Sequence, residues 1–313
     1  MYDKVTLYLN SATVSNYATV AESVLLNLNS VIEKEISPGQ YIKAGNIGGL
    51  QVSIYPYNIY ISGSLAKYYY GNNVARLDRC NTAYAIEKLC DQLHSDITTA
   101  KVTTIEFGAV FTLSRPVKEY YARFGYVPNM LRWLDIPGET IYYRTRGKDP
   151  AKQLAFYDKS KECSIAGVDI PDVLSNLLRY EMRLKRLPQI LQEKDITAGK
   201  LADNRLYSKI MEKYKENYFA IHKDRTRIIA PPQSIKTSNS AFDLFIAQLI
   251  INKEEDFEQY IKILQASNSL SKTEIYRLRQ RFEKIKTLNS TVEIDSDIIQ
   301  ELDDDINNLD NII

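Results

Sequence analysis

Apolar and polar positions alternate in short runs over the first half of the chain, the pattern of half-buried β-strands. In residues 1–10 the apolar side chains Val5, Leu7 and Leu9 fall on one face of a predicted strand. A possible helix follows within residues 11–34, and glycines 45, 48 and 49 mark a turn. Residues 50–55 and 58–63 then predict a hairpin across Pro56.

The same alternation continues to about residue 185, interrupted by helical spacings. The predicted elements, in chain order, are a helix at 82–93 capped by Thr82, a strand at 101–113, a helix near 116–124, a loop rich in glycine and proline, a strand hairpin formed by 140–145 and 153–158, a short helical stretch opened by Pro171, and a strand at 178–184. Strands in antiparallel pairs with helices between them predict an α+β fold, an antiparallel sheet with flanking helices.

Beyond about residue 190 the spacing becomes helical, so a small all-α region is predicted to follow the sheet. The pattern divides the chain into a main domain over 1–230, a proline-containing linker over 231–240, a helical region over 241–287 and an acidic amphipathic tail over 288–313. Within the helical region, helices are predicted at 241–251, 254–266 and 272–286. The last of these has a basic face that suits either a DNA-binding helix-turn-helix or an ordinary bundle helix.

Charge is distributed unevenly along the chain. Residues 288–313 contain eight acidic and no basic residues, and taking this charge from the net +1 of the whole chain leaves +9 on residues 1–287. A basic body suits a polyanion such as DNA, because each phosphate contact releases counterions. The apolar stripe of the acidic tail indicates packing on this body or on a partner.

Several protein classes do not fit the sequence. It contains no run of 18 apolar residues, so no membrane span is expected. The first ten residues resemble neither a signal nor a transit peptide, which predicts a cytoplasmic protein. The three cysteines match no zinc or redox spacing.

Metal chemistry, if present, would have to use oxygen ligands. His94 and His222 are the two histidines and lie far apart in sequence, and neither a HExxH motif nor a phosphate-binding glycine loop occurs. Carboxylates alone favour Mg²⁺ or Mn²⁺. Glu106, Glu162 and Glu181 lie in or beside predicted strands, where a charge must be paired or bound to metal; a salt-bridged core carboxylate is the alternative for each.

One of the 23 tyrosines lies in a segment that suits nucleophilic chemistry. Tyr157 belongs to the predicted strand LAFYDK, and strict alternation places Lys159 on the same face. An ammonium beside a phenol lowers its pKa or neutralises a bound phosphate. Most of the other tyrosines must be structural.

Four segments, in order, resemble the gene II/X family of replication initiators from filamentous phages and related plasmids. They are GSLAKYYYGNN (63–73), TIE (104–106, where the family has RID), YDKSKE (157–162) and the LRxE-type strand LLRYEMRLK (177–185). The resemblance covers roughly residues 40–190.

This resemblance implies a metal-dependent nuclease domain that starts rolling-circle replication. Such an initiator nicks one strand at the origin, forms a 5′-phosphotyrosine and frees a 3′-OH, and later rejoins the strand. The family's active tyrosine corresponds to Tyr157, with Lys159 beside it. Glu106, Glu181 and Glu162 correspond to the carboxylates and would hold Mg²⁺ or Mn²⁺.

The expected partner is origin DNA, single-stranded or cruciform at the nick, with host replication proteins as further partners. The side chains expected to contact DNA come from the GSLAKYYYGNN segment, the 140–158 hairpin and the LRYE strand: Lys67, Asn72, Asn73, Arg144, Arg146, Arg179 and Arg183. Tyr180, next to Glu181, is an alternative nucleophile, although alternation directs it away from Glu181.

Two other functions remain open at this point. The change from RID to TIE suits a non-catalytic, sequence-specific DNA-binding regulator on the same fold. The acidic tail suits a structural or assembly protein. A nicking enzyme requires that Tyr157, Glu106 and Glu181 come together beside basic residues, whereas the other two functions do not.

Overall fold

The computed structural model describes most of the chain. The described residues are 1–73, 75–135, 140–167, 176–223, 243, 246, 254–267, 269–288 and 298–309. The chain divides into two compact units, one formed by Met1–Lys223 with Leu302–Ile313 and the other by Asp224–Glu301.

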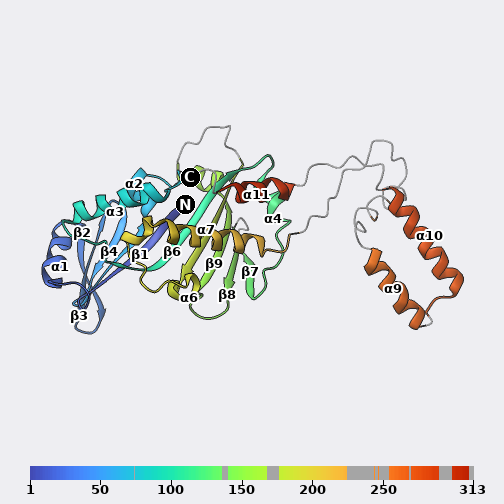
Figure 1. Cartoon of the computed structure of the whole chain (residues 1–313), viewed down its shortest axis with the longest axis horizontal. Helices are drawn as coiled ribbons and strands as arrows, with labels where there is room; N and C mark the ends of the chain where they lie inside the picture. Colours follow the sequence, from blue (N-terminus) through green and yellow to red (C-terminus); the bar gives the residue numbers. More distant parts are fainter. Residues whose placement is uncertain are drawn as a thin grey trace. The chain divides into compact units, whose positions relative to one another are not determined.

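The first unit is built on one antiparallel sheet, in which the described residues form ten strands in the order β2-β3-β4-β5-β1-β6-β10-β9-β8-β7 (Figure 1). The strands are β1 (Tyr2–Asn10), β2 (Asn29–Ser37), β3 (Gln40–Ile47), β4 (Leu50–Ile54), β5 (Asn58–Ser64), β6 (Lys101–Thr112), β7 (Met130–Leu134), β8 (Thr140–Thr145), β9 (Lys152–Asp158) and β10 (Leu177–Lys185). The α+β fold with an antiparallel sheet is therefore confirmed.

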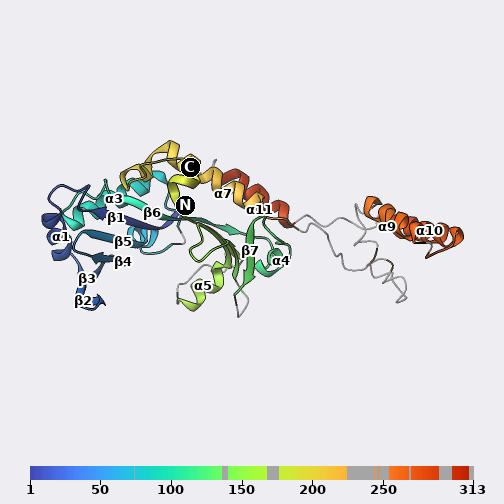
Figure 2. The ribbon, with the colours of Figure 1, turned by 90° about the horizontal axis from the view of Figure 1, so that it is seen from below.

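Helices connect these strands and lie on both faces of the sheet. They are α1 (Tyr17–Leu26), α2 (Leu65–Tyr70), α3 (Arg79–Leu93), α4 (Val117–Tyr121), α5 (Lys159–Ile165), α6 (Leu187–Leu191), a 3₁₀ helix (Gly199–Ala202) and α7 (Asn204–Phe219). Figure 2 shows α3 and α7 along one face of the sheet and α5 on the opposite face.

The face under α7 is the aromatic core. Tyr180 of β10 stacks between Phe156 of β9 and Tyr214 of α7, with ring centroids 4.4 and 4.2 Å away. Phe107 of β6 meets Tyr214 edge-on at 5.5 Å. Burial of such rings contributes much of the stability of a fold, so this face accounts for many of the structural tyrosines.

The opposite face is polar where β1, β6, β10 and β9 meet. Because side chains alternate along a strand, the neighbours of the core aromatics point to this side. Glu106 precedes Phe107, Glu181 follows Tyr180, and Tyr157 follows Phe156. Helix α5 lies on this side (Figure 2).

The segment after the first strand differs from the prediction. The helix expected within 11–34 covers only Tyr17–Leu26, and the chain then forms strands β2 and β3. All nine residues of β2 are exposed. A strand with no buried face has no reason to alternate, so its sequence carries no strand period. The predicted glycine turn is confirmed at Gly48 and Gly49, which both have positive φ and join β3 to β4, whereas Gly45 lies within β3, opposite Val52.

Helix α3 and strand β7 also differ from the prediction. Helix α3 starts at Arg79 rather than Thr82, because Asp78 caps it by accepting a hydrogen bond from the Asn81 amide at 2.7 Å. The predicted loop after residue 124 contains strand β7, the exposed edge of the sheet. The helical stretch predicted at Pro171 lies outside the described residues.

Residues 302–309 complete the first unit from a distant part of the sequence. Leu302, Ile306 and Leu309 are buried. Asp303 accepts a hydrogen bond from the Tyr218 hydroxyl at 2.7 Å and pairs with Lys223 at 3.5 Å. The apolar stripe predicted for the acidic tail is thus in contact with the first unit at its described end.

The second unit contains the helices α9 (Glu254–Ala266) and α10 (Lys272–Leu288), close to the predicted bounds. They pack through Phe257 and Phe282, whose rings stack 3.9 Å apart. Ser271 and Glu274 form a reciprocal cap at the start of α10. The predicted linker 231–240 and most of the predicted helix 241–251 lie outside the described residues. Within the described parts, no helix is both long and apolar enough to span a bilayer.

Candidate active site

Strand register brings the predicted catalytic segment next to the LRYE strand. Strand β10 lies between β9 and β6, with Arg179 opposite Tyr157 and Glu181 opposite Ala155. On its other edge Glu181 lies opposite Gly108, and Arg183 opposite Glu106. Three segments that are far apart in sequence therefore meet on the polar face of the sheet.

Tyr157 is held by the carboxylate of Glu181. Its hydroxyl donates a hydrogen bond to Glu181 Oε1 at 2.8 Å, and the same oxygen accepts one from Arg179 Nε at 2.6 Å. Burial and the charge of Glu181 raise the pKa of Tyr157 far above its usual value, although Arg179 acts in the opposite direction. The phenol therefore carries its proton, and Glu181 is the group that would accept it.

Arg179 is buried and connects strand β10 with strand β1 and with the segment that contains Asn73. Besides Glu181, its guanidinium donates to the Asn73 carbonyl at 2.7 Å and to the carboxylate of Asp3. With its donors used inside the protein, Arg179 is not the exposed DNA contact that the sequence indicated. A buried guanidinium with two carboxylate partners instead fixes the positions of those carboxylates.

Asp3 is the member of this cluster that the sequence analysis missed. It is 2% exposed and also accepts a hydrogen bond from Ser64 Oγ at 2.5 Å. Burial alone would raise the pKa of Asp3, but Arg179, Ser64 and Asn73 together lower it. The signal was available: Asp3 is an acidic residue inside an alternating strand, the criterion that singled out Glu106.

Glu106 lies beside this cluster on the neighbouring strand. It is 6% exposed and pairs with Lys4 at 3.4 Å and Arg183 at 3.3 Å. Its buried Oε2 atom accepts no hydrogen bond of good geometry among the described residues. Burial raises the pKa of Glu106; Lys4 lowers it in part, and the charge of Glu181 raises it further. The two carboxylates are thus close enough to influence one another electrostatically.

Glu162 does not join these carboxylates. It is in α5, and its Oε2 lies 2.9 Å from Lys159 Nζ, one turn earlier in the same helix. Within the described residues, no three acidic, histidine or cysteine side chains are grouped so as to hold a metal. Of the three predicted ligands, the structure brings together Glu106 and Glu181 only.

Lys159 begins helix α5 instead of continuing strand β9. Strand β9 ends at Asp158, whose side chain caps α5 by accepting a hydrogen bond from the Lys161 amide. The side chain of Lys159 is consequently buried, and its ammonium donates to Asn73 Oδ1 at 3.0 Å as well as to Glu162. Arg179, rather than Lys159, is the cation paired with the hydrogen-bond acceptor of Tyr157.

The alternative nucleophile, Tyr180, lies on the other face of the sheet. It is fully buried in the aromatic core, and its hydroxyl donates to the Tyr214 carbonyl at 3.1 Å. A phosphate could reach this hydroxyl only if the core opened, so the geometry does not support Tyr180 as a nucleophile.

The remaining predicted DNA contacts separate into two groups. Asn73 is half-buried and occupied by Lys159, Arg179 and Asp3. The others are exposed: Lys67, Asn72, Arg144, Arg146 and Arg183. Arg144 and Arg183 share the polar face, because both pair in register with Gln153 of β9.

Gly108 allows the close approach of Glu181. A Cβ atom at this position would lie 2.8 Å from the Tyr180 carbonyl oxygen and 3.0 Å from Glu181 Cγ. Any side chain at residue 108 would therefore displace the carboxylate or the backbone of β10. A glycine two residues after Glu106, inside a predicted strand, is thus a sequence signal of this close approach.

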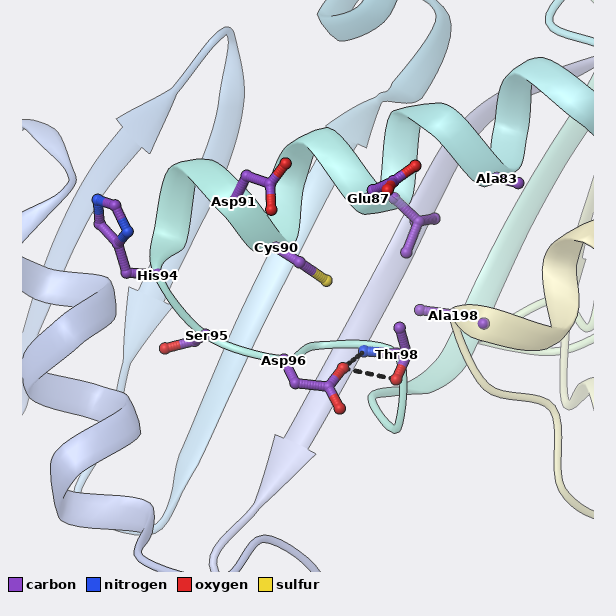
Figure 3. A pocket seen from close by; sticks show the side chains of 11 residues that line it. Ala83, Glu87, Cys90, Asp91, His94, Ser95, Asp96, Thr98 and Ala198 are labelled. Carbon is purple, nitrogen blue, oxygen red and sulfur yellow. Dashed lines mark hydrogen bonds between the residues drawn. The ribbon is translucent and has the colours of Figure 1, made fainter.

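A separate hollow of about 790 Å³ lies beside α3 (Figure 3). Its polar lining includes Glu87, Asp91 and Asp96, and Figure 3 shows Asp96 bonded to Thr98. An acidic lining repels phosphate. This hollow is therefore a poor site for DNA.

Comparison with known proteins identifies the family of the chain. Residues 1–205 match the family model for the N-terminal region of a phage replication-associated protein, the gene II protein. Among solved structures, a rolling circle replication initiator protein from Geobacillus stearothermophilus aligns with 14% identity over 75% of this chain and 89% of its own, with a TM-score of 0.41. No curated protein matches the chain. The family match covers all of the strands that build the site, and the chain thus belongs to the family of replication-associated proteins defined by the N-terminal region of the gene II protein.

Proposed function

We propose that this protein is a rolling-circle replication initiator that nicks and rejoins one strand of a phage or plasmid origin through Tyr157. The observation that carries the proposal is the hydrogen bond from the Tyr157 hydroxyl to Glu181, with Glu106 on the adjoining strand. A nucleophile, an acceptor for its proton and a second carboxylate are thus adjacent on a face that also exposes arginines.

In the proposed reaction, the Tyr157 oxygen attacks the scissile phosphorus and its proton passes to Glu181. The bond from phosphorus to the 3′-oxygen breaks, and that oxygen takes up a proton and leaves as a free 3′-OH. The 5′ side of the strand remains as a phosphotyrosine ester. Rejoining is the reverse, in which a 3′-OH attacks the ester and Tyr157 recovers its proton. Because burial raises the pKa of Tyr157, the phenol needs a nearby base to remove its proton during the attack.

Glu106 and Glu181 are the residues that would hold Mg²⁺ or Mn²⁺. Magnesium is commonly held by one or two carboxylates together with substrate phosphates and water, so a cluster of three protein ligands is not required. The buried Glu106 Oε2 lies 3.4 Å from the Lys4 ammonium without a hydrogen bond of good geometry, so a metal ion could take the place of that ammonium. When bound, the cation would polarise the scissile phosphate.

Arg144, Arg146 and Arg183 are the exposed cations that would contact the DNA backbone near Tyr157. The proposal places the enzyme in the cytoplasm of a bacterial host, where host replication proteins would extend the freed 3′-OH. A purely regulatory DNA-binding role would not need a tyrosine bonded to a carboxylate, and this favours the nicking enzyme over the regulator.

The test is a nicking assay on a supercoiled plasmid that carries the replicon's own DNA, in buffer with Mn²⁺. Tyr157→Phe should reduce conversion to open circles by at least about a thousandfold, as loss of a nucleophile does. Tyr180→Phe is the matched control and should still nick. Mass spectrometry of the DNA-linked peptide should identify Tyr157. A covalent DNA adduct in the Tyr157→Phe protein would show that the nucleophile has been misassigned.

A further inference from the structure

The edge of the polar face carries an aromatic stack that the proposed reaction does not use. Trp133 of β7, the single tryptophan of the chain, stacks on Tyr142 of β8 with ring centroids 4.9 Å apart and an 18° angle between the planes. The guanidinium of Arg144 lies 4.7 Å from the centre of the Trp133 ring. Below, these three residues are called the aromatic platform.

The aromatic platform is in line with the candidate active site. In strand register Trp133 lies opposite Tyr142, Tyr142 opposite Ala155, and Ala155 opposite Glu181. These four residues therefore form one row across four adjacent strands, on one face of the sheet. Glu181 and Lys4 both contribute to the pKa of Tyr142, which burial raises, so the phenol lies within electrostatic reach of the site.

The platform is not part of a closed core. Trp133 and Tyr142 are half-exposed, and Arg144 is exposed. The neighbouring apolar side chains Leu131 and Leu134 are 42% and 49% exposed on the same edge strand. By contrast, the aromatic rings on the opposite face are almost fully buried under α7.

We propose that the aromatic platform binds an unpaired base of the single-stranded DNA beside the nick. The inference rests on the proposed function and assigns a subsite to it. An aromatic surface with a guanidinium stacks on the flat face of a base, which is available only where the strand is unpaired. Arg144 and Arg183 supply positive charge along the path from the platform to Glu181, which suits the phosphates of the same strand.

The exposed rings and the neighbouring arginines favour single-stranded DNA as the ligand of the aromatic platform. A protein partner for an exposed aromatic edge would not need arginines in the row beside it, and duplex DNA keeps its base faces stacked internally. The short distance in register between platform and Tyr157 also fits a strand held by one base while an adjoining phosphate is attacked.

The lone tryptophan makes the test direct, because its fluorescence reports on the platform. The full chain is titrated, in EDTA so that no nicking occurs, with an unlabelled thymidine oligonucleotide about ten nucleotides long, a typical site size. Tryptophan fluorescence should be quenched by the single strand and much less by a duplex of equal length. Unchanged fluorescence when the single strand is bound, or equal quenching by the duplex, would overturn the proposal.

Variants give a second, independent readout by fluorescence anisotropy of a labelled oligonucleotide. Trp133→Ala and Tyr142→Leu should each weaken binding by on the order of tenfold, as loss of one stacking ring does. Trp133→Phe keeps a ring and should retain most of the affinity. Tyr84→Ala is the matched control, because Tyr84 is a 58% exposed ring on α3, and it should bind normally.

These outcomes are separable from those of the proposed function. The quenching result is obtained with the wild-type protein without any nicking, whereas the nucleophile is judged by nicking and adduct mapping. Normal affinity of both Trp133→Ala and Tyr142→Leu would refute the platform and leave the role of Tyr157 standing. Should Trp133→Ala fail to fold, as judged by circular dichroism, Tyr142→Leu and the wild-type quenching still decide.

Discussion

The two faces of the sheet differ although they are formed by the same strands. The face under α7 packs Phe107, Phe156 and Tyr180 against one another and against Tyr214. The opposite face, one residue away on each strand, presents Glu106, Tyr157 and Glu181. One face thus stabilises the fold by burying aromatic rings, and the other holds charged groups close together at an energetic cost.

Two tyrosines make the comparison specific. The hydroxyl of Tyr180 donates to a main-chain carbonyl inside the core, whereas that of Tyr157 donates to a carboxylate on the polar face. Residue type is therefore no guide to function in a chain with 23 tyrosines. The face on which a tyrosine lies and the charge of its acceptor distinguish a packing residue from a candidate nucleophile.

The largest effect is expected from Arg179, because it neutralises the charges of the polar face. Arg179→Met would leave Asp3 and Glu181 without their guanidinium in a buried setting. Removing one partner of a buried ion pair costs about 3–5 kcal/mol. Urea denaturation followed by circular dichroism should show a loss of unfolding free energy in this range.

Arg183→Met is the control for that change. Arg183 is on the same strand and face but its side chain is 46% exposed, and it pairs with Glu106 at 3.3 Å. Because the Arg183 side chain is partly solvated and Lys4 also pairs with Glu106, the loss of unfolding free energy should be well below that of Arg179→Met, on the order of 1 kcal/mol. Equal destabilisation by the two substitutions would show that the buried cluster has no special role in stability.

An intermediate effect is expected from divalent cations. If Glu106 and Glu181 bind Mn²⁺ in the folded state, a concentration ten times the dissociation constant adds about 1.4 kcal/mol to the free energy of unfolding. Thermal unfolding with and without Mn²⁺ measures this. Glu106→Gln should abolish the gain, and Glu162→Gln should keep it, because Glu162 pairs with Lys159 instead.

The gain from Mn²⁺ should also depend on pH. Burial and Glu181 raise the pKa of Glu106, so a proton competes with the cation at a higher pH than for an ordinary glutamate. Stabilisation should therefore decline as the pH is lowered through the mildly acidic range. Equal gains in the Glu106→Gln and Glu162→Gln proteins would mean that the ion binds elsewhere.

The smallest effect is expected inside the aromatic core. Tyr180→Phe keeps the stacked ring and removes one buried hydrogen bond, which costs about 1 kcal/mol. Denaturant unfolding should show this loss while nicking, measured well below the melting temperature, is unchanged. A loss of nicking with unaltered stability would contradict the division of roles between the two faces.

The sequence predicted the elements that are buried on one face and failed where that condition was absent. Strands β6, β9 and β10 alternate because one side of each packs into the core, and their bounds were close to the prediction. Strand β2 is exposed on both sides, so its sequence has no apolar period to detect. Strand β7, at the opposite edge, was missed for a similar reason, since none of its five residues is fully buried.

The site was predictable in part. The four segments placed Tyr157, Glu106 and Glu181 together, as the register of β9, β10 and β6 has them. The partners of Lys159 could not be predicted from alternation, which assumes that a strand continues, because Asp158 ends β9 by capping a helix. Asp3 carried the same local signal as Glu106, an acidic residue inside an alternating strand, but its pairing with Arg179, 176 residues away, is a contact that no local pattern records.

The return of residues 302–309 to the first unit has a consequence for the order of synthesis. Leu302, Ile306 and Leu309 are buried in a unit whose other residues end at Lys223. A ribosome therefore completes the whole of the second unit before it releases the segment that finishes the first. The sheet must persist during that interval without its last apolar contacts, and a nascent chain stopped before residue 302 would expose the surface that they cover.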